Sequence, residues 1–195
     1  ICRHGDDLEC HHRLRCFQAH GHAVHSFLAH DLELTPFKEY PREIAEVASM
    51  AMELFSMDEW DRFFDNENDL RRAKEHQFER VITIFPWIAT IDKFQHWIYE
   101  NPSHTTEHRS KKWMDILAEF TPESLDFSGL EEYRRYGWQK QLHLFEVPFY
   151  YIEYGIAQLG AIGLWKQFKK NKEQAIENYI HALKLGGTRT LPELY

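Results

Sequence analysis

The spacing of apolar residues after the first sixteen positions constrains the fold of this chain more than any other feature. From Phe17 to the C-terminus, apolar side chains recur at intervals of three and four residues, which is the period of a helix with one buried face. No segment alternates apolar and polar residues over a convincing strand length, and no internal repeat is present. The sequence therefore predicts an all-α fold.

Prolines, glycines and polar capping residues mark where the predicted helices begin and end. Pro41 suits a helical first turn, Pro86 predicts a kink or break inside a long helix, and Gly186 lies where a C-terminal cap is expected. The predicted helices cover residues 17–28, 41–55, a short segment 58–64 capped by Asp58, 68–99, 107–119, a long aromatic stretch 130–170 that contains Pro148, and 172–185.

Composition and charge exclude several classes of protein. With 43% hydrophobic and 15% aromatic residues the chain can bury a sizeable core, so intrinsic disorder is excluded. A net charge of -8 argues against nucleic-acid binding, and no apolar run approaches the roughly 20 residues of a membrane-spanning helix. Three cysteines make no closed disulfide framework. We therefore expect a cytoplasmic protein with neither nucleic-acid nor membrane partners.

Residues 1–16 differ from the rest of the chain. All three cysteines lie there, and no helical or strand period is visible. We expect an irregular segment at 1–16, out of frame or poorly ordered, followed by one helical domain at 17–195. No pair of its cysteines and histidines shows the two-residue gap of a zinc finger or ribbon, which disfavours a small metal knuckle. Without an initial Met or a signal peptide, the chain is expected to begin inside a longer product.

Three segments carry residue types that zinc hydrolysis uses. Residues 21–27 read Gly-His-Ala-Val-His-Ser-Phe, residues 43–50 read Glu-Ile-Ala-Glu-Val-Ala-Ser-Met, and residues 143–154 read His-Leu-Phe-Glu-Val-Pro-Phe-Tyr-Tyr-Ile-Glu-Tyr. They resemble, in this order, the second half of a His-Glu-x-Gly-His-Ala-x-His helix, a downstream helix with a carboxylate ligand, and a substrate-side His/Tyr segment. This combination resembles the oligoendopeptidase F and thimet oligopeptidase family of zinc metallopeptidases, over about residues 17–195.

The resemblance implies an all-helical enzyme with a deep channel that cleaves short peptides. It implies that His22 and Glu46 bind Zn²⁺, and that His143, Tyr151 and Tyr154 bind substrate and stabilise the oxyanion. In such a site, two histidines four residues apart on a helix hold zinc with a third ligand from another helix. A Glu beside the first His accepts a proton from the zinc-bound water, which attacks the peptide carbonyl.

The motif is incomplete in its first half. The same alignment places Gln18 where the first zinc-binding His belongs and Ala19 where the Glu base belongs. A neutral amide is a poor zinc ligand, and Ala19 has no group that moves a proton. His25 lies on nearly the same helix face as His22 and is an alternative ligand, although the resemblance favours a supporting role. Residues 1–20 are either an out-of-frame reading or a genuine divergence, and both explanations remain open.

These observations predict an impaired zinc metalloendopeptidase, with zinc weakly bound or absent. Its partners would be short peptides and a missing N-terminal half of the same protein. The alternatives are a catalytically dead helical module that binds peptides and a non-functional fragment. We expect the side-chain ends of His22 and Glu46 to lie within about 8 Å, because one ion with bonds of ~2 Å bridges no larger gap. Pro148 shifts the helical phase of the substrate-side segment, so Tyr151 is favoured over Tyr150 there.

Overall fold

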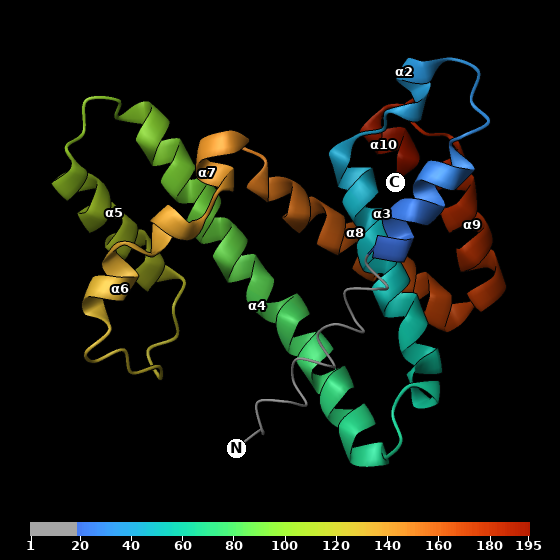
Figure 1. Cartoon of the computed structure of the whole chain (residues 1–195), viewed down its shortest axis with the longest axis horizontal. Helices are drawn as coiled ribbons and strands as arrows, with labels where there is room; N and C mark the ends of the chain where they lie inside the picture. The colour runs from blue at the N-terminus through green and yellow to red at the C-terminus, as the bar shows by residue number, and fades with distance from the viewer. Residues whose placement is uncertain (1–18) are drawn as a thin grey trace. The chain divides into compact units, whose positions relative to one another are not determined.

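The computed structural model describes residues 19–195, and helices are the only regular secondary structure in that range (Figure 1). The all-α prediction is confirmed for this part of the chain. The first helix covers residues 19–28 of the described range. The other helices, with η for a 3-10 turn, are α2 (Thr35–Lys38), α3 (Arg42–Ser56), η1 (Met57–Arg62), α4 (Glu67–Glu100), α5 (Thr106–Glu119), α6 (Glu131–Arg135), η2 (Gly137–Lys140), α7 (His143–Glu146), α8 (Tyr151–Lys170), α9 (Lys172–Lys184) and α10 (Leu191–Leu194).

The chain divides into two compact units. Of the described residues, one unit combines 19–79 with Ile156–Tyr195, and the other is Arg80–Gly155. The boundaries fall inside α4 and inside α8, so each of these long helices contributes residues to both units. The two groups of predicted site residues are therefore described separately, because His22 and Glu46 belong to the first unit and His143 belongs to the second.

The first unit is built around α3, whose apolar side chains recur at helical spacing on a buried face. The Phe55 ring stacks on Phe168 of α8 with centroids 4.6 Å apart and meets Tyr179 of α9 edge-on at 5.4 Å. The Tyr179 hydroxyl donates to the Ala48 carbonyl oxygen at 2.7 Å, and burial raises the pKa of Tyr179. These contacts join α3, α8 and α9 in one core.

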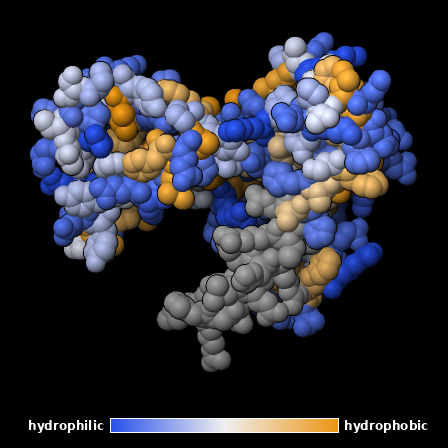
Figure 2. Space-filling view, turned by 45° about the horizontal axis from the view of Figure 1, so that its top comes forward, coloured by the Kyte–Doolittle hydropathy of each residue, from blue (hydrophilic) through white to orange (hydrophobic). Residues whose placement is uncertain are grey.

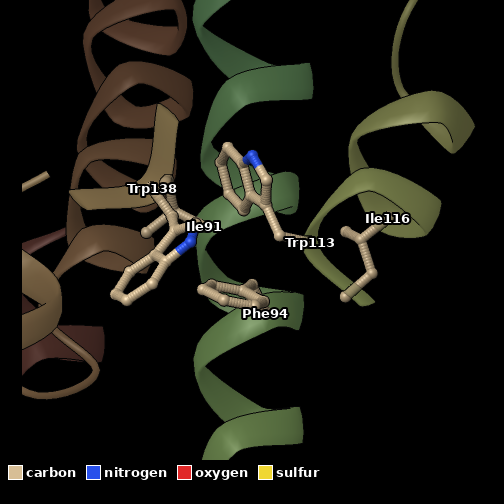
Figure 3. Close-up of a cluster of buried hydrophobic side chains, with 5 residues drawn as sticks. All are labelled: Ile91, Phe94, Trp113, Ile116 and Trp138. Carbon is tan, nitrogen blue, oxygen red and sulfur yellow. The ribbon is translucent and has the colours of Figure 1, made fainter. Parts of the chain in front are cut away.

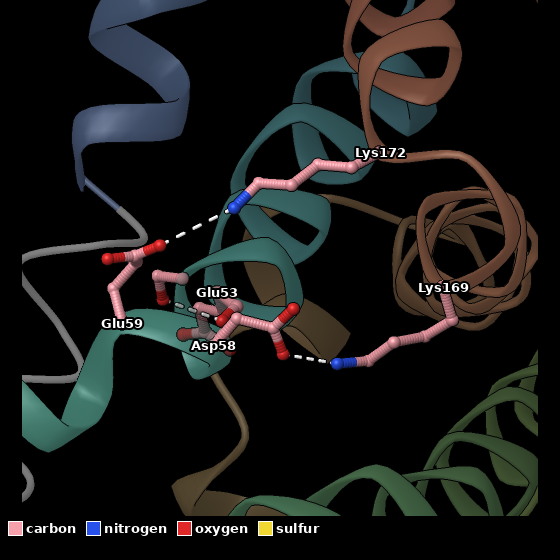
Figure 4. Close-up of polar contacts among 6 residues, drawn as sticks. Glu53, Asp58, Glu59, Lys169 and Lys172 are labelled. Carbon is pink, nitrogen blue, oxygen red and sulfur yellow. Dashed lines mark hydrogen bonds and ion pairs between the residues drawn. The ribbon is translucent and has the colours of Figure 1, made fainter.

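Two ion pairs connect η1 to the C-terminal helices of the same unit (Figure 4). Lys169 of α8 pairs with Asp58, and Lys172 of α9 lies 3.4 Å from Glu59. The predicted capping role of Asp58 is wrong, because η1 follows α3 directly and its N-cap residue is Ser56. All four charged side chains are partly exposed, so each pair contributes at most about 1 kcal/mol.

The second unit has an aromatic core between α4, α5 and η2 (Figure 3). Its buried members are Ile91, Phe94, Trp113, Ile116 and Trp138. The Trp113 ring meets Phe94 edge-on with centroids 5.1 Å apart, and the Trp113 indole nitrogen donates to the Arg134 carbonyl oxygen at 2.8 Å. This hydrogen bond attaches α6 to α5 and satisfies the polar atom of a buried indole ring.

The two stretches with an internal proline have different structures. α4 continues through Pro86, so the alternative of a break there is wrong, and the Thr90 hydroxyl donates to the Pro86 carbonyl oxygen at 2.8 Å. The stretch 130–170 is instead divided into α6, η2, α7 and α8. Phe149, next to Pro148, has a φ of 59°, a left-handed conformation that no α-helix contains.

The face of the molecule in Figure 2 is mostly hydrophilic, with hydrophobic residues in separate patches. Phe27 and Tyr133 are the most exposed large apolar side chains of residues 19–195, and they lie in different units. None of the helices in the described range has both the length and the apolar character to cross a membrane.

Candidate active site

Gly21 brings the first helix into backbone contact with α3. A Cβ atom at position 21 would lie 2.4 Å from the Ser49 Cα and 2.5 Å from the Ala48 carbonyl oxygen. Because both neighbours are backbone atoms, any larger residue would force the two helices apart. The glycine of the motif therefore fixes the distance between the helix that carries His22 and the helix that carries Glu46.

The side chains of His22 and Glu46 meet next to this contact. His22 Nε2 lies 3.9 Å from a carboxylate oxygen of Glu46, well inside the expected limit of about 8 Å. Two ligands of one tetrahedral zinc ion, each at ~2.0–2.1 Å, are roughly 3.3 Å apart, so a small side-chain movement would let both bind one ion. His22 is 42% exposed and Glu46 is 12% exposed. An imidazole and a carboxylate placed in this way fit two of the ligands of a zinc ion.

His25, the alternative ligand, is a buried and stacked ring. It has no exposed surface, and it stacks on Tyr40 with ring centroids 3.4 Å apart. Burial, and to a smaller extent the charge of His22, lowers the pKa of His25 from 6.5 to about 4. Neither ring nitrogen has a hydrogen-bond partner in the described structure. A neutral, buried imidazole in face-to-face contact with a tyrosine is consistent with the supporting role favoured by the motif.

The other members of the predicted zinc site do not complete it. Ala19 is exposed in the first helix and has no side chain that accepts a proton. Gln18 and the irregular segment 1–16 lie outside the described residues. From Ala19 to the C-terminus, no three histidine, cysteine or acidic side chains are grouped so that they could hold a metal ion. Among the described residues, His22 and Glu46 therefore lie together without a third metal-binding side chain beside them.

The second group of predicted residues surrounds the His143 ring at the start of α7. His143 Nδ1 lies 2.6 Å from the amide nitrogen of Gln141, and His143 Nε2 lies 3.3 Å from the hydroxyl of Tyr154. The ring centroid of Tyr151 is 5.0 Å from that of His143, and the centroids of Tyr150 and Tyr154 are both at 5.7 Å. The three predicted residues therefore lie together. Tyr150 contacts the same imidazole, so the expected preference for Tyr151 over Tyr150 does not remove Tyr150 from the group.

Trp87 of α4 holds the hydroxyl group of Tyr151. The indole nitrogen of Trp87 donates to the Tyr151 oxygen at 3.1 Å. Burial raises the pKa of Tyr151, and the hydrogen bond from Trp87 opposes this shift to a smaller extent. Tyr151 is therefore protonated at neutral pH and has a proton to donate. No motif identified Trp87, because an aromatic residue at helical spacing predicts only a core position.

Gln95 of α4 holds the turn between α7 and α8, a role that the motifs did not predict. Its side chain is 2% exposed, and its amide oxygen accepts from the backbone N–H of Phe149 at 3.0 Å. Its amide nitrogen donates to the Leu144 carbonyl oxygen at 3.5 Å. The left-handed Phe149 is thus held by a buried side chain from another helix. A glutamine next to the core residue Phe94 was the available signal, since a buried amide requires partners.

The fold and the two groups define the class of the protein. Helices are the only regular secondary structure of residues 19–195, with a histidine and a carboxylate paired across two helices in one unit and a histidine beside three tyrosines in the other. Paired imidazole and carboxylate ligands on separate helices are typical of helical zinc metallopeptidases.

Comparison with known families makes this class specific. The model of peptidase family M3 matches residues 14–195, which is most of the chain. The chain belongs to peptidase family M3. The resemblance inferred from the three motifs is confirmed at the level of the family.

Individual relatives agree with this assignment. The chain is 27% identical to the oligoendopeptidase F homolog of Borreliella burgdorferi over 175 residues, which are 87% of this chain and 29% of that protein. It superposes on a structure of PZ peptidase A with inhibitor 2 at a TM-score of 0.82 and 30% identity, with 89% of this chain and 31% of that one covered. For a structure of an oligoendopeptidase F from Bacillus anthracis strain Ames, the TM-score is 0.68 and the identity 27%, over 89% of this chain and 27% of that one. The chain thus spans about three tenths of the length of the relatives it matches.

Proposed function

We propose that this chain is part of a zinc oligopeptidase whose hydrolytic centre is impaired, and that its ligands are short peptides. The separation of 3.9 Å between His22 Nε2 and the Glu46 carboxylate carries this proposal. It is supported by the backbone contact at Gly21, which holds the two ligand-bearing helices together. When bound, zinc supplies a Lewis acid and an activated water for the attack on a peptide carbonyl.

The residues of this chain would perform the binding steps better than the chemical step. His22 and Glu46 would hold the metal ion, but Ala19 leaves no side chain there to accept a proton from the attacking water. Tyr151 and Tyr154 would donate hydrogen bonds to the carbonyl oxygen of a peptide and stabilise the charge that develops on it. We therefore expect the chain to bind zinc weakly and short peptides measurably, and to cleave a quenched-fluorescent peptide at no detectable rate.

Zinc titration of the full chain tests the proposal. We expect weak binding of one zinc ion in competition with a chromophoric chelator, and loss of this binding in His22→Ala and in Glu46→Ala. His181→Ala and Glu173→Ala are matched controls, because both residues are exposed on α9 and should leave zinc binding unchanged.

Two results of this titration would contradict the assignment. If zinc binds as well to His22→Ala and Glu46→Ala as to the unmodified chain, the metal is held elsewhere. If the unmodified chain retains one tightly bound zinc during dialysis against a chelator, a further ligand such as Gln18, His20 or His25 completes the site. Chelator-sensitive cleavage of peptides by the unmodified chain would show that another residue acts as the base.

A second candidate is a module that binds peptides without zinc or hydrolysis. The group around His143 supports it, because hydrogen bonds join His143 to Gln141 and Tyr154 and join Tyr151 to Trp87. In the described residues no third metal-binding side chain lies beside His22 and Glu46. Fluorescence anisotropy of a labelled short peptide in excess chelator is the measurement. Binding that is weakened by Tyr154→Phe but not by Tyr133→Phe, an exposed tyrosine of α6, would support this candidate. The absence of any peptide binding would favour a non-functional fragment.

A further inference from the structure

The hydrogen bonds around Tyr151 show which way a tyrosine proton points in this group. An indole nitrogen only donates hydrogen bonds, so the direction of the bond from Trp87 to Tyr151 is fixed. The Tyr151 oxygen accepts, and its own hydroxyl proton is directed to a different acceptor. A tyrosine held in this way by a neighbouring N–H is ready to donate to a ligand.

The bond between His143 and Tyr154 has no such fixed direction. A neutral imidazole carries its proton on one of its two nitrogens, and the other nitrogen accepts. If the proton is on Nε2, His143 donates to the Tyr154 oxygen, as Trp87 does to Tyr151. If the proton is on Nδ1, the lone pair on Nε2 instead accepts the hydroxyl proton of Tyr154. In that case Tyr154 cannot give the same proton to a ligand.

Gln141 decides between these two forms. Its amide nitrogen lies 2.6 Å from His143 Nδ1, and an amide nitrogen donates but does not accept. Nδ1 must then be the unprotonated nitrogen, and the proton is on Nε2, facing Tyr154 at 3.3 Å. With this tautomer, the Tyr154 oxygen accepts a hydrogen bond from a ring N–H, as the Tyr151 oxygen does from the indole of Trp87.

We propose that Gln141 is a positioning residue that fixes the Nε2–H tautomer of His143 and thereby makes Tyr154 a hydrogen-bond donor to the bound ligand. This inference rests on the proposed function, in which that ligand is the carbonyl oxygen of a short peptide. The Tyr151 and Tyr154 rings lie 5.3 Å apart in one edge-to-face pair. With each hydroxyl oxygen accepting a ring N–H, both protons would be directed to other acceptors, and the carbonyl oxygen of a bound peptide would be one of them.

Long-range ¹H–¹⁵N correlation spectra of the full chain with ¹⁵N-labelled histidine test the proposal directly. The spectra are recorded well above the ordinary histidine pKa of about 6.5, and the His143 signals are identified by their loss in His143→Asn. We expect the Nε2–H pattern in the unmodified chain. Gln141→Glu keeps the shape but presents only acceptors, so His143 should change to the Nδ1–H form. Gln141→Met removes the donor without supplying an acceptor and should give a mixture of the two forms.

The control is Gln139→Glu, at an exposed position of η2 two residues before Gln141, which should leave the tautomer of His143 unchanged. The Nδ1–H form in the unmodified chain, or no change of tautomer in Gln141→Glu, would overturn the proposal. In peptide binding, Gln141→Glu should weaken the affinity about as much as Tyr154→Phe, and the double variant no further, because both remove the same hydrogen bond. The tautomer is measured without zinc, peptide or turnover, so the inference about Gln141 and the proposed function fail independently.

Discussion

The His22–Glu46 pair and the group around His143 are held in place by different kinds of interaction. The pair depends on the backbone contact of two helices at Gly21, and its two side chains are the only zinc ligands proposed among the described residues. The His143 group depends on hydrogen bonds between side chains, from Gln141 and Trp87, and on the turn that Gln95 holds. Each residue that the resemblance assigns to that group is present.

This difference separates what the fold requires from what the chemistry requires. At Gly21 only a glycine fits between two backbones, so the packing of the first helix on α3 depends on that residue. At Ala19 the side chain is exposed, and alanine favours a helix at least as strongly as glutamate does. An alanine in place of the expected glutamate at position 19 is therefore compatible with the helix that carries it.

The largest expected effect would come from introducing the expected zinc-binding histidine and glutamate base at positions 18 and 19. In the double variant Gln18→His with Ala19→Glu, a third protein ligand should tighten zinc binding by roughly 10²-fold, since each ligand carries a few kcal/mol of the total. The added Glu should raise peptide cleavage by about 10²–10⁴ over Gln18→His alone, the usual worth of a general base. Zinc titration and cleavage of a quenched-fluorescent peptide are the measurements.

The single variant Ala19→Glu is the matched control for that prediction. It supplies the base but not the ligand, so zinc binding and cleavage should stay at the level of the unmodified chain. If Ala19→Glu alone restores cleavage, His22 and Glu46 are sufficient to hold a working zinc ion, and no third protein ligand is needed.

His25, in the first unit, should make the free energy of unfolding depend on pH. Its pKa in the folded chain is lowered from 6.5 to about 4, so the unfolded chain binds more protons between these values. Its contribution is fully present above pH 6.5 and is lost as the pH falls toward 4, by about 3 kcal/mol in total. Denaturant unfolding between pH 4 and 7 measures this loss.

His25→Phe keeps a ring to stack on Tyr40 and removes the titrating group. The pH dependence of unfolding over this range should then become much flatter than in the unmodified chain. His181→Phe, at an exposed position of α9, should leave it as steep as before. An unchanged slope in His25→Phe would assign the dependence to other groups.

The backbone contact at Gly21 predicts a somewhat smaller effect on the free energy of unfolding. Gly21→Ala should destabilise the chain by about 1–3 kcal/mol, because the added methyl group meets the backbone of Ser49 and Ala48. Gly163→Ala is the matched control. It lies within α8 with no atom within 4 Å of a new Cβ, so it should stabilise the chain by up to about 1 kcal/mol. Thermal unfolding of both variants is the measurement. If both substitutions destabilise the chain, or both stabilise it, the effect at Gly21 does not come from the backbone contact.

The sequence predicted the helices better than it predicted the connections between them. Helical periodicity placed α3, α4, α5 and α9 within a few residues of their bounds, because each buries one face along its length. The division of 130–170 was missed, since the left-handed Phe149 is stabilised by Gln95, more than fifty residues earlier in the chain. A periodicity within one segment contains no information about such a partner.

The motifs likewise predicted the residues of the candidate site more readily than the residues that hold them. His22, Glu46, His143, Tyr151 and Tyr154 each followed from a motif, and the proximity of the first two is observed. The roles of Gln141 and Trp87 did not follow from the resemblance, because a glutamine between two short helices and a tryptophan on a helix are common in every fold. Their importance depends on the hydrogen bonds that they make with His143 and Tyr151, and these contacts are visible only in the three-dimensional structure.

The smallest expected effect concerns the turn between α7 and α8, and it tests whether hydrogen bonds hold the His143 group. Gln95→Met removes the bonds to the Phe149 N–H and the Leu144 carbonyl while keeping most of the side-chain volume. Phe149 is 36% exposed, so water can replace part of what is lost, and the expected cost is about 1 kcal/mol. Hydrogen exchange should be faster at the Phe149 amide but unchanged in the first helix, whose contact with α3 does not involve Gln95.

The control Gln139→Met, at an exposed position, should alter neither the stability nor the exchange at Phe149. If exchange at Phe149 is the same in Gln95→Met as in the unmodified chain, the left-handed turn is held by its own packing, and the contrast between a backbone-held pair and a side-chain-held group is lost.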